Sequence, residues 1–310
     1  MRQVEYLSPS SIATYYQDPQ AYYLKYLADF PPPREPQTPA MAVGSSFDAY
    51  TKSYLHNNLF GKVDPRFDFQ TIFEAQVEPQ CRDKALIDGK KCFDKYAETG
   101  ALNDLMILLS KASSTPRFEF DLHGAVEGHR EGVTTNVGAV ILLGKPDAHF
   151  VTEAGVDVIL DWKVNGFYSA ASPAPGYLNL RPDNTRHKDV FAQWHKDVQV
   201  NMAKSLDLVK EDWAAQLSIY AWLLGMPMGS QFVVAIDQLA CRNGTIRIAE
   251  HRAFVSDKFQ FDVFRKAQHL WDLVHSEYFF RDVSFDESQR KCAMLDEMSK
   301  AMDPEFQKML

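Results

Sequence analysis

Three residues near the middle of the chain have side chains and a spacing that suit metal-assisted chemistry. Asp147 follows one apolar segment, and Asp161 and Lys163 end the next, which begins at residue 156. Asp161 and Lys163 are two residues apart on a predicted strand, so their side chains share one face. An antiparallel neighbour of that strand can bring Asp147 beside Asp161.

Two adjacent carboxylates repel each other unless a cation lies between them, and oxygen ligands suit a hard divalent ion such as Mg²⁺ or Mn²⁺. Lys163, on the same face, can hold or deprotonate a metal-bound water, or stabilise charge on a phosphate. The alternative is a strand end with solvated charges, because Asp-x-Lys is a common tripeptide. The largely apolar segment 156–160 favours a buried central strand, and a buried strand end favours a chemical role for Asp161 and Lys163.

The elements around these residues predict a mixed α/β (α+β) fold, in which helices flank a mixed central sheet and helical insertions precede it. Ser8 and Pro9 begin a helix that Asp18-Pro19 interrupts. Further helices are expected at 41–56, at 71–112 in two or three pieces, from about 189, at 211–224 and at 257–280. The expected strands are 117–127, 133–143 and 156–160, as a meander, followed by 231–236 and 245–254.

We interpret residues 1–310 as a single domain with a helical N-terminal part and an αβ core. The helical part covers 1–112 and the core 113–280, with a helical or loop insertion at about 166–210. An acidic tail follows at 281–310.

Composition excludes several classes of protein. Hydrophobic residues make up 45% of the chain, which is enough for a buried core, and the formal net charge of −8 disfavours a polybasic nucleic-acid binder. No apolar run approaches the roughly 18 residues of a membrane span. The four cysteines are scattered without a CxxC pair, and no apolar run follows Arg2 as in a signal peptide. We therefore expect a cytoplasmic protein of a bacterium or a phage-infected host, with no membrane partner.

Positive charge is concentrated after Lys163. Residues 161–210 contain seven Lys and Arg against five Asp and Glu, a local charge of +2 against −10 elsewhere. Basic side chains interleaved with aromatic ones suit a surface that follows a nucleic-acid strand, although a solvated loop and helix would look the same. The basic candidates for DNA contact are Arg181, Arg186, Lys188 and Lys196.

Four segments together resemble a known family. Pro146-Asp147, thirteen further residues and Asp161-Trp162-Lys163 resemble the signature of the PD-(D/E)xK nuclease superfamily, and more narrowly its RecB-like and Cas4-like branch, which includes many phage exonucleases. Residues 7–27 resemble the N-terminal helical motif of that branch. Residues 44–48 resemble its G-x-x-x-H motif with Asp48 in the His place, and residues 216–220 resemble its Q-x-x-x-Y motif. The four occur in the order of the family.

The resemblance implies a restriction-endonuclease-like core and a role for each motif residue. The implied catalytic residues are Asp147, Asp161, Lys163, Gln216 and Tyr220. The implied metal ligands are Asp48, Asp147, Asp161 and the backbone carbonyl of Trp162. The implied DNA contacts in the first two motifs are Ser10, Tyr15 and Gly44.

Two of these assignments have ordinary alternatives. Taken alone, Asp48 is better interpreted as a solvent-facing helix residue paired with Lys52, four positions later. Gln216 and Tyr220 lie one helical turn apart and would support Lys163 or a DNA phosphate, or simply pack in a helix.

The chain departs from the iron–sulfur members of this branch. Asp18 stands before Pro19 where those members carry Cys, and Cys292 is the one late cysteine, so a four-thiolate site cannot be built. A Walker A motif is also absent. We expect one or two Mg²⁺ or Mn²⁺ ions as cofactors, without an iron–sulfur cluster and without a nucleotide.

Together with the metal-binding pattern, the resemblance implies a metal-dependent deoxyribonuclease, and by analogy with that branch an exonuclease of recombination or repair. DNA, linear duplex or single-stranded, is the expected partner, and a recombinase or single-strand-binding protein would suit that role. A structure-selective or nicking endonuclease on the same site stays open. A non-catalytic DNA-binding or partner-binding module also stays open, and it is supported by Asp48 in the place of the family His.

Overall fold

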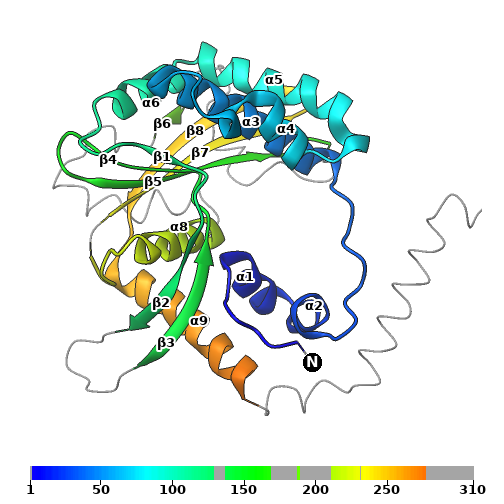
Figure 1. The fold of residues 1–310 in the computed structure, drawn as a ribbon, viewed down its shortest axis with the longest axis vertical. Coiled ribbons are helices and arrows are strands. Elements are labelled where there is room, and N and C mark those ends of the chain that lie inside the picture. Colours follow the sequence, from blue (N-terminus) through cyan, green and yellow to red (C-terminus); the bar gives the residue numbers. More distant parts are fainter. Residues whose placement is uncertain (1, 129–136, 169–186, 189–210, 231, 277–310) are drawn as a thin grey trace, which may run out of the picture.

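A computed structural model describes residues 2–128, 137–168, 187–188, 211–230 and 232–276. Within these ranges a mixed sheet has helices on both faces, with further helices at the N-terminus, which confirms the predicted fold class (Figure 1). A separate two-stranded hairpin lies beside the α8 helix. No helix in the described ranges is both long and apolar enough to cross a membrane.

The N-terminal helices begin and end as the sequence predicts. Ser8 caps α1 (Pro9–Gln17) in a reciprocal capping box with Ser11. Asp18 ends α1 and caps α2 (Pro19–Tyr22), because its side chain accepts from two backbone N–H groups of the next turn. A π-helical turn, η1 (Tyr23–Leu27), follows.

One long helix and three shorter ones cover a face of the main sheet. The long helix is α3 (Pro39–Phe60), and it is longer at both ends than the predicted 41–56. The predicted pieces of 71–112 are α4 (Phe69–Gln76), α5 (Arg82–Glu98) and α6 (Ala101–Ser110), with breaks near Pro79 and Gly100 as expected. Short 3₁₀ turns, η2 (Pro65–Phe67) and η3 (Pro79–Cys81), connect α3, α4 and α5. Apolar side chains of these helices and of the sheet form one core.

The main sheet has the strand order β1-β4-β5-β7-β8-β6. The parallel pair β5 (Asp157–Asn165) and β7 (Val233–Arg242) is central, and β4 (Ala148–Val151) and β1 (Arg117–Phe118) extend the sheet beyond β5. On the other side β8 (Thr245–Phe254) is antiparallel to β7 and parallel to the short β6 (His187–Lys188). The strand β7 runs six residues past its predicted end at 236.

The predicted three-strand meander is wrong in its third strand: the first two expected segments do pair antiparallel, but the segment 156–160 belongs to the other sheet. Residues 117–127 are two strands, because Glu119 has a positive φ of 48° and turns the chain out of β1 before β2 (Leu122–Gly128) begins. β2 pairs with β3 (Val137–Gly144) in the separate hairpin, so β3 is not a neighbour of β5. The four-residue β4, too short for an alternation signal, takes that place instead.

Two helices complete the described fold. α8 (Glu211–Leu223) matches its prediction within one residue and contacts both β5 and the hairpin. α9 (Asp257–His275) packs on α1, α8 and β3. The end of the predicted helix 257–280, the predicted helix from 189, most of the insertion 166–210 and the tail 281–310 lie outside the described residues.

The contact between β3 and α8 depends on a glycine. A Cβ atom on Gly144, the last residue of β3, would lie 2.5 Å from Cδ1 of Tyr220 and 3.0 Å from Cδ1 of Leu223. Such distances require the ring or the strand to move. Gly144 therefore fixes how closely Tyr220 approaches the start of the Lys145-Pro146 turn.

We predict that Gly144→Ala lowers the free energy of unfolding by about 1–3 kcal/mol, the usual range for overpacking. The matched control is Gly124→Ala on the paired strand β2, where the nearest atom to a new Cβ, Leu223 Cδ2, is 3.6 Å away at ordinary contact distance. Urea unfolding of the two variants measures the difference. Equal losses would show that the predicted contact with Tyr220 does not limit the packing.

Candidate functional site

Asp147 and Asp161 lie opposite each other at the junction of β4 and β5. Ala148 pairs with Leu160 in the antiparallel register, so Asp147, one residue earlier, faces Asp161. The strand preceding Asp161 is buried, and the Asp161 side chain itself is only 5% exposed. The structure thus brings together two carboxylates that the sequence singles out, through β4 rather than β3.

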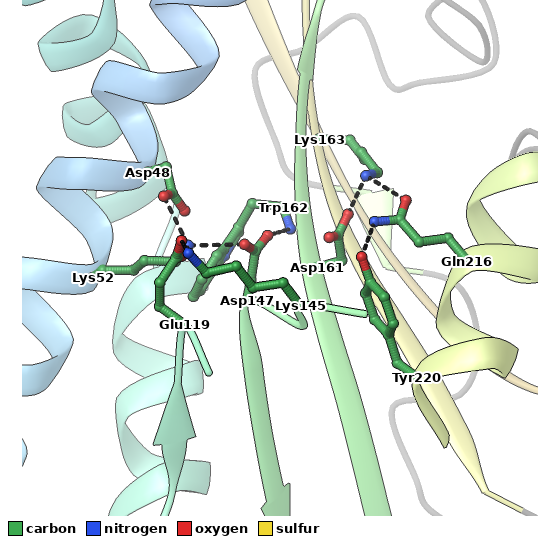
Figure 2. A network of polar contacts seen from close by, with 10 residues as sticks. All are labelled: Asp48, Lys52, Glu119, Lys145, Asp147, Asp161, Trp162, Lys163, Gln216 and Tyr220. Atoms are coloured by element: carbon green, nitrogen blue, oxygen red, sulfur yellow. Dashed lines mark hydrogen bonds and ion pairs between the residues drawn. The ribbon is translucent and has the colours of Figure 1, made fainter. Parts of the chain in front are cut away.

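Asp147 also belongs to a second carboxylate group, which we call the triad: Asp48 of α3, Glu119 just after β1, and Asp147. One oxygen from each lies within 4.8 Å of the other two. The Lys52 ammonium lies among them, with Nζ 2.8 Å from Asp48 Oδ2, 2.8 Å from Asp147 Oδ1 and in contact with Glu119 Oε2 (Figure 2). The Lys52 side chain is 1% exposed.

Sequence reasoning missed Glu119 and treated Lys52 as a surface partner of Asp48. The Asp48–Lys52 pair does form, but Lys52 is buried and Asp48 is only 15% exposed, so the pair is not a solvated surface pair. The four-residue spacing of Asp48 and Lys52 on one helix is the sequence pattern that predicts this pair. Glu119 had no such signal, because it reaches the site through tertiary pairing: its backbone N–H donates to the Asp147 carbonyl at 3.2 Å.

On the α8 side, a short hydrogen-bonded chain begins at Lys163 (Figure 2). Lys163 Nζ lies 2.5 Å from Asp161 Oδ2 and donates to Gln216 Oε1 at 3.0 Å. Gln216 Nε2 in turn donates to the Tyr220 hydroxyl at 2.6 Å. Gln216 and Tyr220, one turn apart on α8, thus act on Lys163 as one unit.

Trp162 connects the site to the opposite face of the sheet. Its backbone N–H donates to Asp147 Oδ2 at 3.0 Å, which fixes the second oxygen of that carboxylate. Its indole is buried on the α3–α5 side and donates to the Tyr96 hydroxyl at 3.4 Å. Tyr96 donates to Asp237, which forms an ion pair with Arg252 at 2.5 Å. The proposed role of the Trp162 carbonyl as a metal ligand stays a prediction.

Burial and neighbouring charges shift the pKa values of the carboxyl groups in the site. Burial raises the pKa of Asp48 to about 7 against the opposing charge of Lys52, and burial likewise raises the pKa of Asp161 to about 7 against Lys163. Burial acts in the same direction on Asp147, but the charge and hydrogen bond of Lys52 outweigh it and leave that pKa lowered. Two carboxyls of the site therefore titrate near neutral pH.

Both lysines of the site keep their protons. Burial alone would lower the pKa of Lys52, but Asp147, Asp48 and Glu119 together raise it well above its ordinary value. For Lys163 burial is likewise outweighed, chiefly by Asp161. At neutral pH each lysine is thus a hydrogen-bond donor and a positive charge, rather than a base.

The triad has the ligand chemistry of a hard divalent cation. It offers carboxylate oxygens, which Mg²⁺ and Mn²⁺ prefer. Asp48 Oδ1 is buried and makes no hydrogen bond within the described part of the chain, so it has a free ligand position. The donor set therefore fits the expected cofactor. Asp161 is not among the three mutually close ligands and pairs with Lys163 instead.

The implied DNA contacts lie in different places. Ser10 borders a cavity of about 390 Å³ that Lys145, Gln216 and Tyr220 also line. Tyr15 packs edge-on against Tyr16, Tyr22 and His269, away from that cavity.

At Gly44 a Cβ would lie 3.8 Å from Val164 Cβ, an ordinary contact, and the implied DNA contact of Gly44 stays a prediction. Among the basic candidates, Arg181, Arg186 and Lys196 lie outside the described ranges. For Lys188 only the backbone, in β6, is described.

A second cavity, of about 700 Å³, lies on the other side of Lys145. It is lined by Lys52 and Glu119 of the site and by Arg117 and Phe120, and it shares Asp121 and Lys145 with the first cavity. The Arg117 guanidinium lies 3.7 Å from the centre of the Phe120 ring. Open space thus borders the site on both sides.

Comparisons with known proteins add little. No protein-family model and no curated protein matches this chain. Among solved structures, the crystal structure of SSO0001 is similar over 82% of this chain and 89% of its own, at 10% identity and a TM-score of 0.26. That likeness carries no argument about fold or function.

The raised pKa values predict how the metal-free protein responds to pH. Asp48 and Asp161 titrate at about 7 in the folded state against 3.8 ordinarily, so the folded state binds more protons between these values. Stability contributed by these two groups therefore falls as the pH rises from about 4 to about 7. The lowered pKa of Asp147 acts below this window and the raised pKa values of both lysines act above it.

We predict that, in EDTA, wild-type protein loses more stability between about pH 5.5 and pH 8 than Asp48→Asn does, by roughly 1 kcal/mol or more. Urea unfolding at the two pH values measures this difference. Histidine titration is common to both proteins and cancels in the comparison. Identical pH dependence would mean that Asp48 is ionised throughout this range.

Proposed function

We propose that this chain is a metal-dependent deoxyribonuclease that hydrolyses DNA phosphodiester bonds, acting as an exonuclease in recombination or repair. One observation carries the proposal: residues from widely separated segments that resemble nuclease motifs meet at one end of the β4–β5 pair. Asp48 comes from α3, Asp147 precedes β4, and Asp161 and Lys163 lie on β5 beside Gln216 of α8. The exonuclease assignment rests on the family resemblance alone.

Each part of the site has a role in this proposal. Asp48, Glu119 and Asp147 would hold the cation, with Asp161 as the further ligand that the resemblance implies. When bound, such a cation would supply positive charge beside the phosphate and lower the pKa of a bound water. Lys163, protonated and held by Asp161 and Gln216, donates to the attacking water or to a phosphate oxygen. In the hydrolysis the water oxygen would bond to phosphorus as the bond to the 3′-oxygen breaks, while the water gives one proton to solvent and the leaving 3′-oxygen takes one from solvent.

The surroundings of the site suit a nucleic-acid strand. The two cavities meet at Lys145, whose side chain is 48% exposed, and the exposed Arg117 borders the larger one. These cations can contact phosphates on either side of the scissile bond. Ser10, at the edge of the smaller cavity, offers a hydroxyl to the same strand. A recombinase or single-strand-binding protein is the proposed partner that would supply or receive that strand.

One observation favours a second candidate, a non-catalytic DNA-binding or partner-binding module. Lys52 already places a positive charge among the triad carboxylates, so the cluster is partly neutralised without a metal ion. In this alternative the site is a structural ion cluster. Lys163 and Gln216 would then hold a phosphate without cleaving it.

A nuclease assay with matched variants tests the proposal. Purified protein should degrade linear DNA with Mg²⁺ or Mn²⁺ and be inactive in EDTA. Asp161→Asn and Lys163→Ala should each lower the rate roughly 100-fold or more, as loss of a charge-stabilising group does. The control is Asp157→Asn, the same substitution on the same face of β5, where the side chain is 40% exposed and pairs with His149. It should stay within about twofold of wild type.

The substrates separate the alternatives. Linear DNA labelled at the 5′ or the 3′ end reports the direction of degradation, and covalently closed circular DNA reports internal cleavage. Cleavage of the circle supports the endonuclease alternative. DNA binding without cleavage under every metal condition supports the non-catalytic module. Cleavage in EDTA, or full activity in Asp161→Asn, contradicts the mechanism.

A further inference from the structure

Lys52 is the least expected residue of the site. A lysine side chain is almost never fully buried unless it is paired, and this one is 1% exposed. All of its described polar contacts are with the triad, and two of them are at 2.8 Å. Its ammonium thus lies where the ligands of the triad converge.

We infer that Lys52 is an internal counter-cation that competes with the divalent metal ion for the triad. In the metal-free protein its ammonium holds Asp48, Glu119 and Asp147 together. When a divalent cation binds, Lys52 loses these contacts. The presence of Lys52 therefore weakens cation binding. The inference rests on the proposed function in one respect, that the triad binds a divalent cation.

Geometry makes the two cations exclusive. One oxygen from each of the three carboxylates lies within 4.8 Å of the other two, so a single cation can contact all three residues at once. Nζ lies 2.8 Å from an oxygen of Asp48 and from one of Asp147. A Mg²⁺ ion about 2.0–2.1 Å from the same oxygens would occupy the volume of the ammonium. Two positive charges at that separation would also repel strongly at low dielectric.

A neighbouring cavity can accept the displaced Lys52 side chain. Lys52 lines the cavity of about 700 Å³ on the η2 side of the triad, together with Asp64 and Asp121. Rotation of the lysine chain into this cavity would return the ammonium to water near other carboxylates. Lys52 and the metal ion can therefore exchange without unfolding of α3.

The experiment measures Mn²⁺ binding to the full chain without DNA, by the loss of the free Mn²⁺ signal in electron paramagnetic resonance. Lys52→Met should bind Mn²⁺ about tenfold or more tightly than wild type, because the competing charge is gone. The control is Lys145→Met, which removes an ammonium that contacts the triad from outside, 2.6 Å from Glu119 Oε1 and 48% exposed. Its effect on Mn²⁺ affinity should be less than about threefold.

The stability of the same variants gives a second readout. Without metal, Lys52→Met should melt several degrees below wild type, because three carboxylates then lack their counter-charge. Mn²⁺ should raise its melting temperature more than that of wild type. Lys52→Gln, which keeps a polar group, is a second variant. Folding of either variant only with Mn²⁺ supports the exchange, and failure to fold at any Mn²⁺ concentration overturns it.

The outcomes separate this inference from the proposed function. Equal or weaker Mn²⁺ binding by Lys52→Met than by wild type overturns the competition and leaves the proposed nuclease intact. Mn²⁺ binding by Lys52→Met but not by wild type supports the competition and counts against a metal-dependent activity of the natural chain. Absence of binding in both proteins overturns the metal site itself and therefore both ideas.

Discussion

The buried cluster around Lys52 is the interaction on which the rest of the site depends. A charge removed from water needs compensation, and here three carboxylates supply it to one ammonium. Asp48 and Lys52 come from α3, whereas Glu119 and Asp147 flank β1 and β4. The cluster therefore joins the helical layer to the end of the sheet, and breaking it would leave uncompensated charge in the interior.

Strand alternation on β5 divides the site into two halves. Asp161 and Lys163 face α8, where Gln216 holds the Lys163 ammonium, while Trp162 between them points to the α3–α5 layer. The Trp162 backbone N–H reaches Asp147, so one strand positions groups on both faces. The parallel pairing with β7 keeps β5 central and buried, which is why its polar groups have perturbed pKa values.

The net charge of −8 has a partly local origin. Some of the negative charge is concentrated in the triad and Asp161, where Lys52 and Lys163 offset it. A net negative charge on the whole protein is therefore compatible with a candidate phosphate-binding site. The exposed cations Lys145 and Arg117 border the cavities beside the cluster. A divalent ion would shift this local balance further toward positive charge.

The sequence by itself determined the helices, most strand positions and the candidate residues on β5 and α8, because caps, alternation and one-turn spacing are local signals. Tertiary structure decided what those signals do not contain. It replaced the predicted meander with the β4–β5 pair, since a four-residue strand carries no alternation pattern. Tertiary structure also buries Lys52 and brings Glu119 into the site. Both outcomes depend on contact between residues that lie 67 positions apart in the sequence. Whether a charge is solvated or buried is a property of the whole fold, and no local pattern encodes it.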